Sequence, residues 1–133
     1  MKLRLMKWLL PVLMIMGTHY VLAAEEIPMY RVYNPYNGEH FYTGNREERD
    51  QLVMIGWQDE GIGWFAPYQG DAVYRLYAPL SGDHHYTLSA AERDMLVTLG
   101  WQDEGVGWFS DLQKTYPMYR VYNPYALVGS HHY

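Results

Sequence analysis

Three histidines recur at matching positions of the chain, and histidine is the residue type here best suited to metal chemistry. His40, His84 and His131 each lie two residues before a tyrosine. If these imidazoles converged on a common axis, they could form a three-histidine metal site with an open coordination position. However, neighbouring side chains of a strand point to opposite faces, and no short histidine or cysteine ligand spacing accompanies them. We therefore expect hydrogen-bonded structural or surface histidines, with no bound metal and no cofactor.

Two carboxylate pairs are the residues that could support hydrolysis. Glycoside hydrolysis uses two carboxyl groups held about 5 to 10 Å apart. Asp59-Glu60 and Asp103-Glu104 are adjacent in sequence, so their side chains diverge on a strand, and the pair recurs although a catalytic site is normally a single constellation. The sequence contains no nucleophile elbow, phosphate-binding loop or zinc-protease motif. We expect no catalytic residues and a protein that is not an enzyme.

Arginine and glutamate also recur in register. Arg31 and Arg75 occupy one strand position, and Glu60 and Glu104 occupy one later position. A buried arginine needs a well-placed carboxylate, because an unpaired buried charge is costly. We predict structural ion pairs between these arginines and glutamates rather than ligand contacts. The third arginine, Arg120, has no such glutamate in its own repeat.

The chain is rich in aromatic residues that carry a polar edge, which is the residue type that sugar-binding surfaces use. An outward-facing tryptophan or tyrosine can stack on a sugar ring, and a histidine beside it can bond to hydroxyl groups. Packing in the core is the open alternative for each of these side chains. The candidate glycan-binding residues are Trp64, Trp108, Tyr33, Tyr77, His40 and His84.

All of these positions belong to a sequence repeat. The segment 29–42 returns as 73–86 and again as 118–133, with offsets of 44 and 45 residues, a range in which one supersecondary unit stacks on copies of itself. We place the repeats at 27–70 and 71–114, followed by a partial unit at 115–133. The partial unit lacks the helix and the tryptophan-rich strand of the other two. Its uncovered faces could support self-association.

Each complete unit reads as two strands, a helix and a third strand. Alternation over 29–33, turn residues at 34–38 and the segment 40–43 predict a β-hairpin. Asn45 and Ser89 stand three residues before a glutamate, the spacing of a helix-capping box. The segments 57–65 and 101–109 predict the third strand. We therefore expect an α+β fold of tandem ββαβ repeats with a pseudo-threefold arrangement, forming a single domain over 25–133.

Residues 1–24 have the features of a secretory signal peptide. Three basic residues precede an apolar run that is too short to span a membrane, and the segment ends in Ala23-Ala24. Cleavage would remove three of the 10 basic residues and none of the 15 acidic residues, leaving a net charge of −8. We expect a secreted or cell-surface protein with no membrane contact after cleavage. Its acidity argues against nucleic acid as a partner.

The repeats resemble a family of secreted bacterial tyrosine-rich domains with the pattern V-Y-R-L-Y-N-P-x-x-G-x-H-F-Y-T, a capped helix, and then L-G-W-x-x-E-G-I-x-W. The matching segments are 30–43, 57–65, 74–87 and 101–109, and the resemblance covers nearly all of 27–133. The family is classed as a domain of unknown function, typically with three units, in proteins that look like cell-surface proteins or cell-wall hydrolases. Similar proteins continue past the position of Tyr133 with another helix and strand.

The resemblance brings no established ligand, so the expected function rests on the residues. Export, acidity, absent catalytic motifs and repeated aromatic residues favour a carbohydrate- or cell-wall-binding module, with a polysaccharide or peptidoglycan as the partner. The alternative is a structural or protein-interaction domain whose aromatic residues form the core.

Overall fold

The computed structural model describes residues 25–133, so the expected signal peptide lies outside the described residues. Within that range the protein is a mixed α+β fold, as predicted, and its strand pairs are antiparallel. Its elements, in chain order, are β1 (Glu26–Tyr33), β2 (His40–Thr43), α1 (Arg46–Met54), β3 (Gln58–Pro67), β4 (Asp71–Ala78), β5 (Asp83–Thr87), α2 (Ala90–Thr98), β6 (Gln102–Ser110), β7 (Val121–Tyr122) and β8 (His131–His132).

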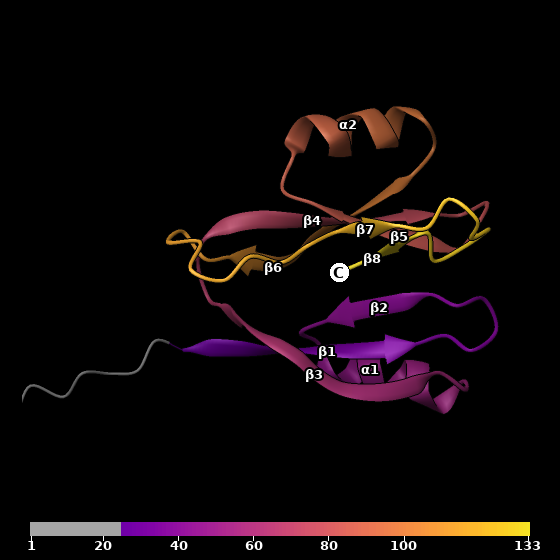
Figure 1. Ribbon diagram of the computed structural model, residues 1–133, viewed down its shortest axis with the longest axis horizontal. Helices are drawn as coiled ribbons and strands as arrows, with labels where there is room; N and C mark the ends of the chain where they lie inside the picture. The colour runs from indigo at the N-terminus through magenta and orange to yellow at the C-terminus, as the bar shows by residue number, and fades with distance from the viewer. Residues whose placement is uncertain (1–24) are drawn as a thin grey trace, which may run out of the picture.

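The strands form two three-stranded sheets and one two-stranded sheet. Their orders are β2-β1-β3, β5-β4-β6 and β7-β8. In the first two sheets the middle strand pairs on both sides, and both pairings with the long third strand contain register shifts at equivalent positions. The C-terminal β7-β8 hairpin runs along the upper sheet, and the chain ends between the two three-stranded sheets (Figure 1).

Tight turns connect the strands of each hairpin. The side chain of Asn34 accepts a hydrogen bond from the backbone N–H of Tyr36 at 3.0 Å, and Asn123 accepts the equivalent bond from Tyr125 at 3.0 Å. These Asx turns make the Asn-Pro-Tyr segments self-supporting. Gly38 then takes a positive φ of 84°, which allows the chain to return.

Each helix begins at the predicted cap, although the expected capping box is altered. The side chain of Asn45 accepts hydrogen bonds from the N–H groups of Glu47 and Glu48, but Glu48 does not reach back to the cap. Thr43 instead bonds to the Asn45 N–H, and its hydroxyl donates to the Glu48 carboxylate at 2.6 Å. The second helix repeats this relay through Thr87, Ser89 and Glu92. The glutamates are thereby left free to meet a second partner.

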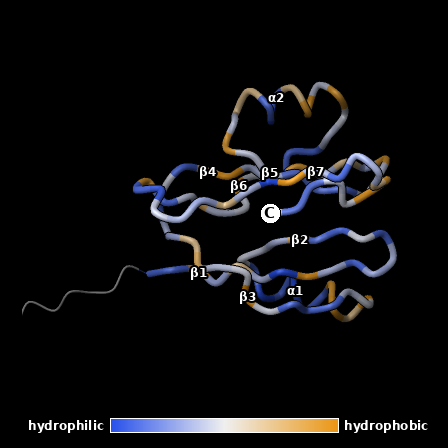
Figure 2. The backbone as a smooth tube through the Cα atoms, viewed as in Figure 1, coloured by the Kyte–Doolittle hydropathy of each residue, from blue (hydrophilic) through white to orange (hydrophobic). Residues whose placement is uncertain are grey.

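The core lies between the sheets and is largely aromatic. Both helices lie on the outside of the molecule and contribute no buried residue (Figure 1). Figure 2 shows β2 and the C-terminus in hydrophilic colours although they are interior, because histidine and tyrosine have low hydropathy. No helix in 25–133 is long and apolar enough to cross a membrane. The buried cluster consists of Met29, Tyr42, Ala66, Val73, Tyr86 and Trp108, with Ile27, Trp64 and Tyr133 packed against it.

Candidate functional site

Three tyrosines at matching positions form a closed hydrogen-bonded ring at the centre of the molecule. The Tyr86 hydroxyl bonds to the backbone of Tyr42, and the Tyr133 hydroxyl bonds to the backbone of Tyr86. The Tyr42 hydroxyl closes the ring by donating to the Tyr133 carbonyl at 3.0 Å and accepting from its N–H at 3.4 Å. The rings meet edge to face, with centroids 5.2 to 5.9 Å apart. The three hairpins do not pair with one another as strands. Instead, each tyrosine hydroxyl bonds to the backbone N–H and carbonyl of a tyrosine on another hairpin.

Burial keeps these hydroxyl groups protonated. It raises the pKa of Tyr42 and of Tyr86 above the ordinary value, and it raises the pKa of Tyr133 to about 12. Each hydroxyl can therefore donate and accept at neutral pH, as the ring requires.

The three recurring histidines lie at three different junctions between hairpins. The ring of His84 packs on Phe41 at 4.8 Å, His131 packs on His85 at 4.9 Å, and His40 packs on His132 at 5.2 Å. Each histidine therefore contacts the residue next to the ring tyrosine of another hairpin. In the part of the chain that the structure describes, no group of three or more potential ligands is placed to hold a metal ion.

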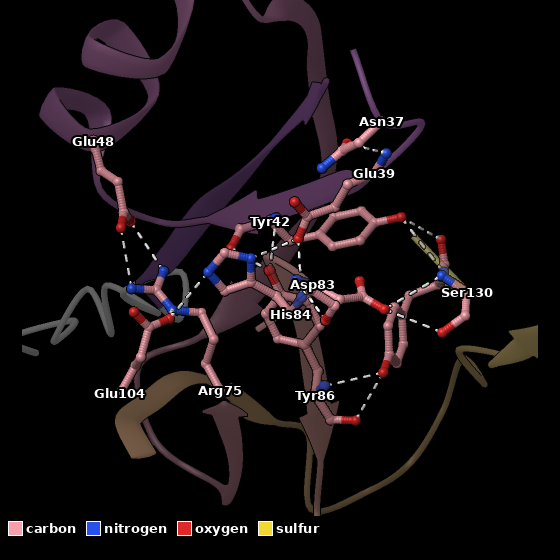
Figure 3. A network of polar contacts seen from close by, with 12 residues as sticks. Asn37, Glu39, Tyr42, Glu48, Arg75, Asp83, His84, Tyr86, Glu104 and Ser130 are labelled. Atoms are coloured by element: carbon pink, nitrogen blue, oxygen red, sulfur yellow. Dashed lines mark hydrogen bonds and ion pairs between the residues drawn. The ribbon is translucent and has the colours of Figure 1, made fainter. Parts of the chain in front are cut away.

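An ion-pair network joins the first two sheets. Arg75 donates two hydrogen bonds of 3.0 Å to the Glu48 carboxylate, and its Nε lies 2.9 Å from Glu104 (Figure 3). The Nε contact is an ion pair without hydrogen-bond geometry. His84 lies between two carboxylates, with Nδ1 2.5 Å from Glu39 and Nε2 3.3 Å from Glu104. The residues come from α1, β4, β5, β6 and the turn before β2, so the network fixes how the two sheets sit together.

His84 carries a positive charge in this network. Burial alone would lower its pKa, but hydrogen bonds and attraction from Glu104 and Glu39 prevail and raise the pKa to about 9. The same contact with His84 and the charge of Arg75 lower the pKa of Glu104 below its usual value, against the opposing effect of burial. His84 and Glu104 are therefore both charged at neutral pH, and their charged groups are engaged in internal contacts.

The other two equivalent arginines, Arg31 and Arg120, each make only some of the ion pairs that Arg75 makes. Arg31 Nε lies 2.8 Å from Glu60, which also contacts His40 at 3.0 Å, but no helix glutamate among the described residues reaches Arg31. Arg120 lies 3.4 Å from Glu92 of α2 and 3.0 Å from His85. Arginine thus pairs with the helix glutamate of the preceding unit at two junctions. This contact between units was not predicted from the sequence.

Of the two tryptophans proposed to face a sugar, Trp108 is buried in the core and Trp64 is half-buried against it. Trp108 is 7% exposed and packs on Tyr86, while Trp64 packs on Tyr42 and on Trp108 at 5.1 Å. The register of β3 and β6 turns their neighbours outward instead, and Phe65 is 56% exposed. Of the two alternatives left open by the sequence, these positions agree with core packing and not with outward-facing tryptophans.

The remaining glycan candidates form internal pairs. Tyr33 lies against His40 and Tyr77 against His84, both with ring centroids 5.0 Å apart and planes tilted by 39°. They are cross-strand partners in their hairpins. One face of each ring is thus occupied by its partner, and His84 is further enclosed by its two carboxylates.

A pocket of about 480 Å³ opens elsewhere, between the first and third hairpins. Both turns lie at the right-hand end of the molecule in Figure 1. Gly129 allows the two hairpin turns to approach closely, because a Cβ at this position would lie only 2.8 Å from the Gly38 carbonyl oxygen. The lining residues are Tyr36, Asn37, Gly38, Asn123, Ala126, Leu127, Val128, Gly129 and His132.

Exposed aromatic rings accompany this pocket. Tyr36 at its edge is 79% exposed, and Tyr125, between the lining residues Asn123 and Ala126, is 92% exposed. Both follow a proline in an Asx turn. The sequence signal that could have identified them is the recurrent Asn-Pro-Tyr, which we interpreted only as turn chemistry.

A second groove of about 630 Å³ runs beside the network between α1 and β6. Its polar walls come largely from side chains that already bond to one another, including Glu48, Arg75 and Glu104. Glu47 and Gln51, also in its lining, make no side-chain hydrogen bond in the described part of the chain.

The chain belongs to the family described as a domain of unknown function (DUF5648), whose model matches residues 28–133. No curated protein matches the chain. No solved structure matches it either.

Proposed function

We propose that this protein is a secreted, non-enzymatic domain that binds carbohydrate, such as a cell-wall polysaccharide or peptidoglycan, in the pocket between the first and third hairpins. The observation that carries the proposal is the combination of a 480 Å³ pocket with exposed tyrosine rings on stiffened turns. Sugar rings offer apolar faces for stacking and hydroxyl groups for polar partners, and ligand pockets are typically 300 to 1,000 Å³.

Part of the pocket lining comes from an insertion in the turn of the third hairpin. Between proline and glycine the third hairpin has four residues, 125–128, where the first hairpin has only Tyr36 and Asn37. The extra residues supply Leu127 and Val128 to the lining. We therefore infer one site at this junction, rather than one on each complete repeat.

We further infer that the domain is built from tandem ββαβ repeats around a pseudo-threefold axis, with a third unit that is incomplete within the described residues. The cyclic bonds of Tyr42, Tyr86 and Tyr133 support this arrangement, as does the rotation of the three histidine contacts. The axis would run through the tyrosine ring, and the pocket would break the symmetry.

Retention on insoluble cell-wall polysaccharide tests the function. Tyr36→Ala and Tyr125→Ala should each weaken retention several-fold, because stacking on an aromatic ring is worth about 1 kcal/mol. Leu80→Ala is the matched control, since Leu80 is the equivalent, fully exposed residue of the second hairpin and does not line the pocket. Wild-type protein that passes through every polysaccharide column would refute the proposal.

A glycine pair tests whether the pocket itself is needed. Gly129→Ala places a Cβ against the Gly38 backbone and should separate the two hairpins, weakening retention. Gly82→Ala is the control, because Gly82 has a similar positive φ of 76° but no neighbour within 4 Å of the added Cβ. Equal retention by both variants would move the binding surface away from this junction.

Secretion is a separate part of the proposal. Intact mass of the exported protein should give an N-terminus near Ala24 or Glu25. Protein that retains Met1 in the membrane fraction would overturn it.

A protein-interaction role is the second candidate, favoured by the exposed outer face of β7. Val121 and Tyr122 are exposed, whereas Val32 and Leu76, the two equivalents of Val121, are completely buried. Within 25–133, β7 pairs only with β8. Such an edge can accept a further strand.

A further inference from the structure

The lining of the pocket between the first and third hairpins contains no carboxylate, lysine or arginine side chain. None of its nine lining residues is Asp, Glu, Lys or Arg, although 22 such residues lie in 25–133. The charged group of a charged sugar would lose its hydration in this pocket without gaining an ion pair, and burying an unpaired charge is costly. A neutral ligand is therefore favoured.

The polar side of the pocket offers hydrogen-bond donors. The Oδ1 atoms of Asn37 and Asn123 already accept backbone N–H bonds from Glu39 and Tyr125, each at 3.0 Å. Their Nδ2 groups make no hydrogen bond to another residue in the described part of the chain. An asparagine amide nitrogen has two N–H donors, so these groups suit a ligand that presents carbonyl or hydroxyl oxygens.

Another part of the lining is aliphatic. Ala126, Leu127 and Val128 are consecutive in the inserted loop and bring no side-chain hydrogen-bonding group. A sugar that carries only hydroxyl groups would leave some of them unpaired against this wall. An acetamido group matches both sides, because its carbonyl accepts from an amide N–H while its methyl group contacts aliphatic side chains.

We propose that this pocket selects a neutral sugar bearing an acetamido group, namely an N-acetylhexosamine unit of a polysaccharide. Tyr36 would stack on the apolar face of the sugar ring, the asparagine amides would donate to its oxygens, and the wall of Ala126, Leu127 and Val128 would contact the acetyl methyl. The inference rests on the proposed carbohydrate function.

Three β-1,4-linked tetrasaccharides of equal length test the selection. They are the N-acetylglucosamine tetramer, the glucosamine tetramer with free amines, and cellotetraose with hydroxyl groups at the same position. Titration calorimetry or NMR titration of the purified protein should show binding of the acetylated tetramer at least about tenfold tighter than either of the others. A tenfold difference is what one or two additional hydrogen bonds and a buried methyl group supply.

A substitution with a matched control ties the selectivity to the site. Asn37→Asp keeps the Oδ1 acceptor for the Glu39 N–H but removes the amide donor, so it should weaken binding of the acetylated tetramer about tenfold. Ser81→Asp adds the same charge to the second hairpin, where Ser81 holds the equivalent bond to the Asp83 N–H, and should leave affinity unchanged. Equal effects of both variants would overturn the assignment.

The outcomes separate the inference from the function on which it rests. If cellotetraose or the free-amine tetramer binds as tightly as the acetylated tetramer, and Tyr36→Ala weakens that binding, the acetamido selection is wrong and the carbohydrate function stands. If insoluble polysaccharide retains the protein but the acetylated tetramer does not bind, the selection is again wrong. If neither polysaccharide nor tetramer binds, both proposals fail.

Discussion

The hydroxyl group of Tyr86 lies 3.0 Å from the backbone N–H nitrogen of Tyr42 and 3.3 Å from its carbonyl oxygen. One phenol therefore satisfies both polar groups of a buried peptide on another sheet. Since an unpaired buried backbone group costs about as much as a lost hydrogen bond, the phenol is essential to the packing of Tyr42.

Tyr86→Phe should lower the free energy of unfolding by about 2 to 4 kcal/mol, because it leaves the N–H and the carbonyl of Tyr42 without a partner. Urea unfolding measures the change. Tyr77→Phe is the control, since the Tyr77 hydroxyl makes no hydrogen bond within 25–133, and it should change stability by less than about 0.5 kcal/mol. A small effect of Tyr86→Phe would mean that water can replace its hydroxyl.

His84 should make stability decrease as the pH rises above neutral. Its folded pKa of about 9 exceeds the ordinary value near 6.5, so its contribution is complete below about pH 6.5 and disappears as the pH rises through 9. The whole contribution is on the order of 3 kcal/mol. Urea unfolding at pH 6 to 9 should show this slope, and His84→Gln should remove most of it.

Other groups act outside that pH window. The pKa of His85 is lowered by burial, so it destabilises the fold only below about pH 6.5. The raised pKa values of the ring tyrosines matter only above about pH 10. A slope between pH 6.5 and 9 that persists in His84→Gln would contradict the assignment.

Arg75→Gln should destabilise the domain more than Arg120→Gln. The Arg75 side chain is 16% exposed and holds carboxylates from two elements, whereas that of Arg120 is 42% exposed and meets Glu92 at its outer edge. Breaking a buried pair from one side costs about 3 kcal/mol or more, but an exposed pair contributes less than about 1 kcal/mol. Thermal melts of the two variants compare them, and equal small shifts would show that both arginines are effectively solvated.

The outer face of β7 should make the protein self-associate or exchange its amide protons quickly in that region. Val121 and Tyr122 are exposed on a strand without a partner on that side among the described residues. Sedimentation velocity over a range of concentrations measures association, and Val121→Lys should abolish it because a charged edge disfavours strand pairing. Leu80→Lys adds the same charge at an exposed position in the turn between β4 and β5, outside β7, and serves as the control. A monomer with slow exchange at Val121 and Tyr122 would contradict this expectation.

The sequence predicted local structure better than it predicted which residues meet across the molecule. Asn45 and Ser89 cap helices as their spacing indicated, and the turns at 34–38 and 78–82 connect the two strands of each hairpin. Alternation could not decide whether Trp64 or Phe65 faces the core, because both are large and apolar, and the core face depends on where the other sheet lies. The pairing of Arg75 with Glu48 was missed for a similar reason, since a capping glutamate already had a local role.

The pocket was missed for a different reason. Its residues come from two turns about 90 positions apart in the chain, and the Asn-Pro-Tyr that both turns share indicates turn structure but not that the two turns meet. Their proximity depends on Gly129 touching the Gly38 backbone, a contact that no local pattern encodes.

The tyrosine ring also constrains how the chain can fold. Its bonds connect residues separated by 44, 47 and 91 positions, so the last bond joins the first hairpin to Tyr133. Contacts at such separations carry a large loop-closure cost before they become favourable, and proteins dominated by them fold slowly. During synthesis the first hairpin therefore has to wait for residue 133 to emerge from the ribosome before its central tyrosine is fully bonded. This order of events favours folding only after residue 133 has been synthesised.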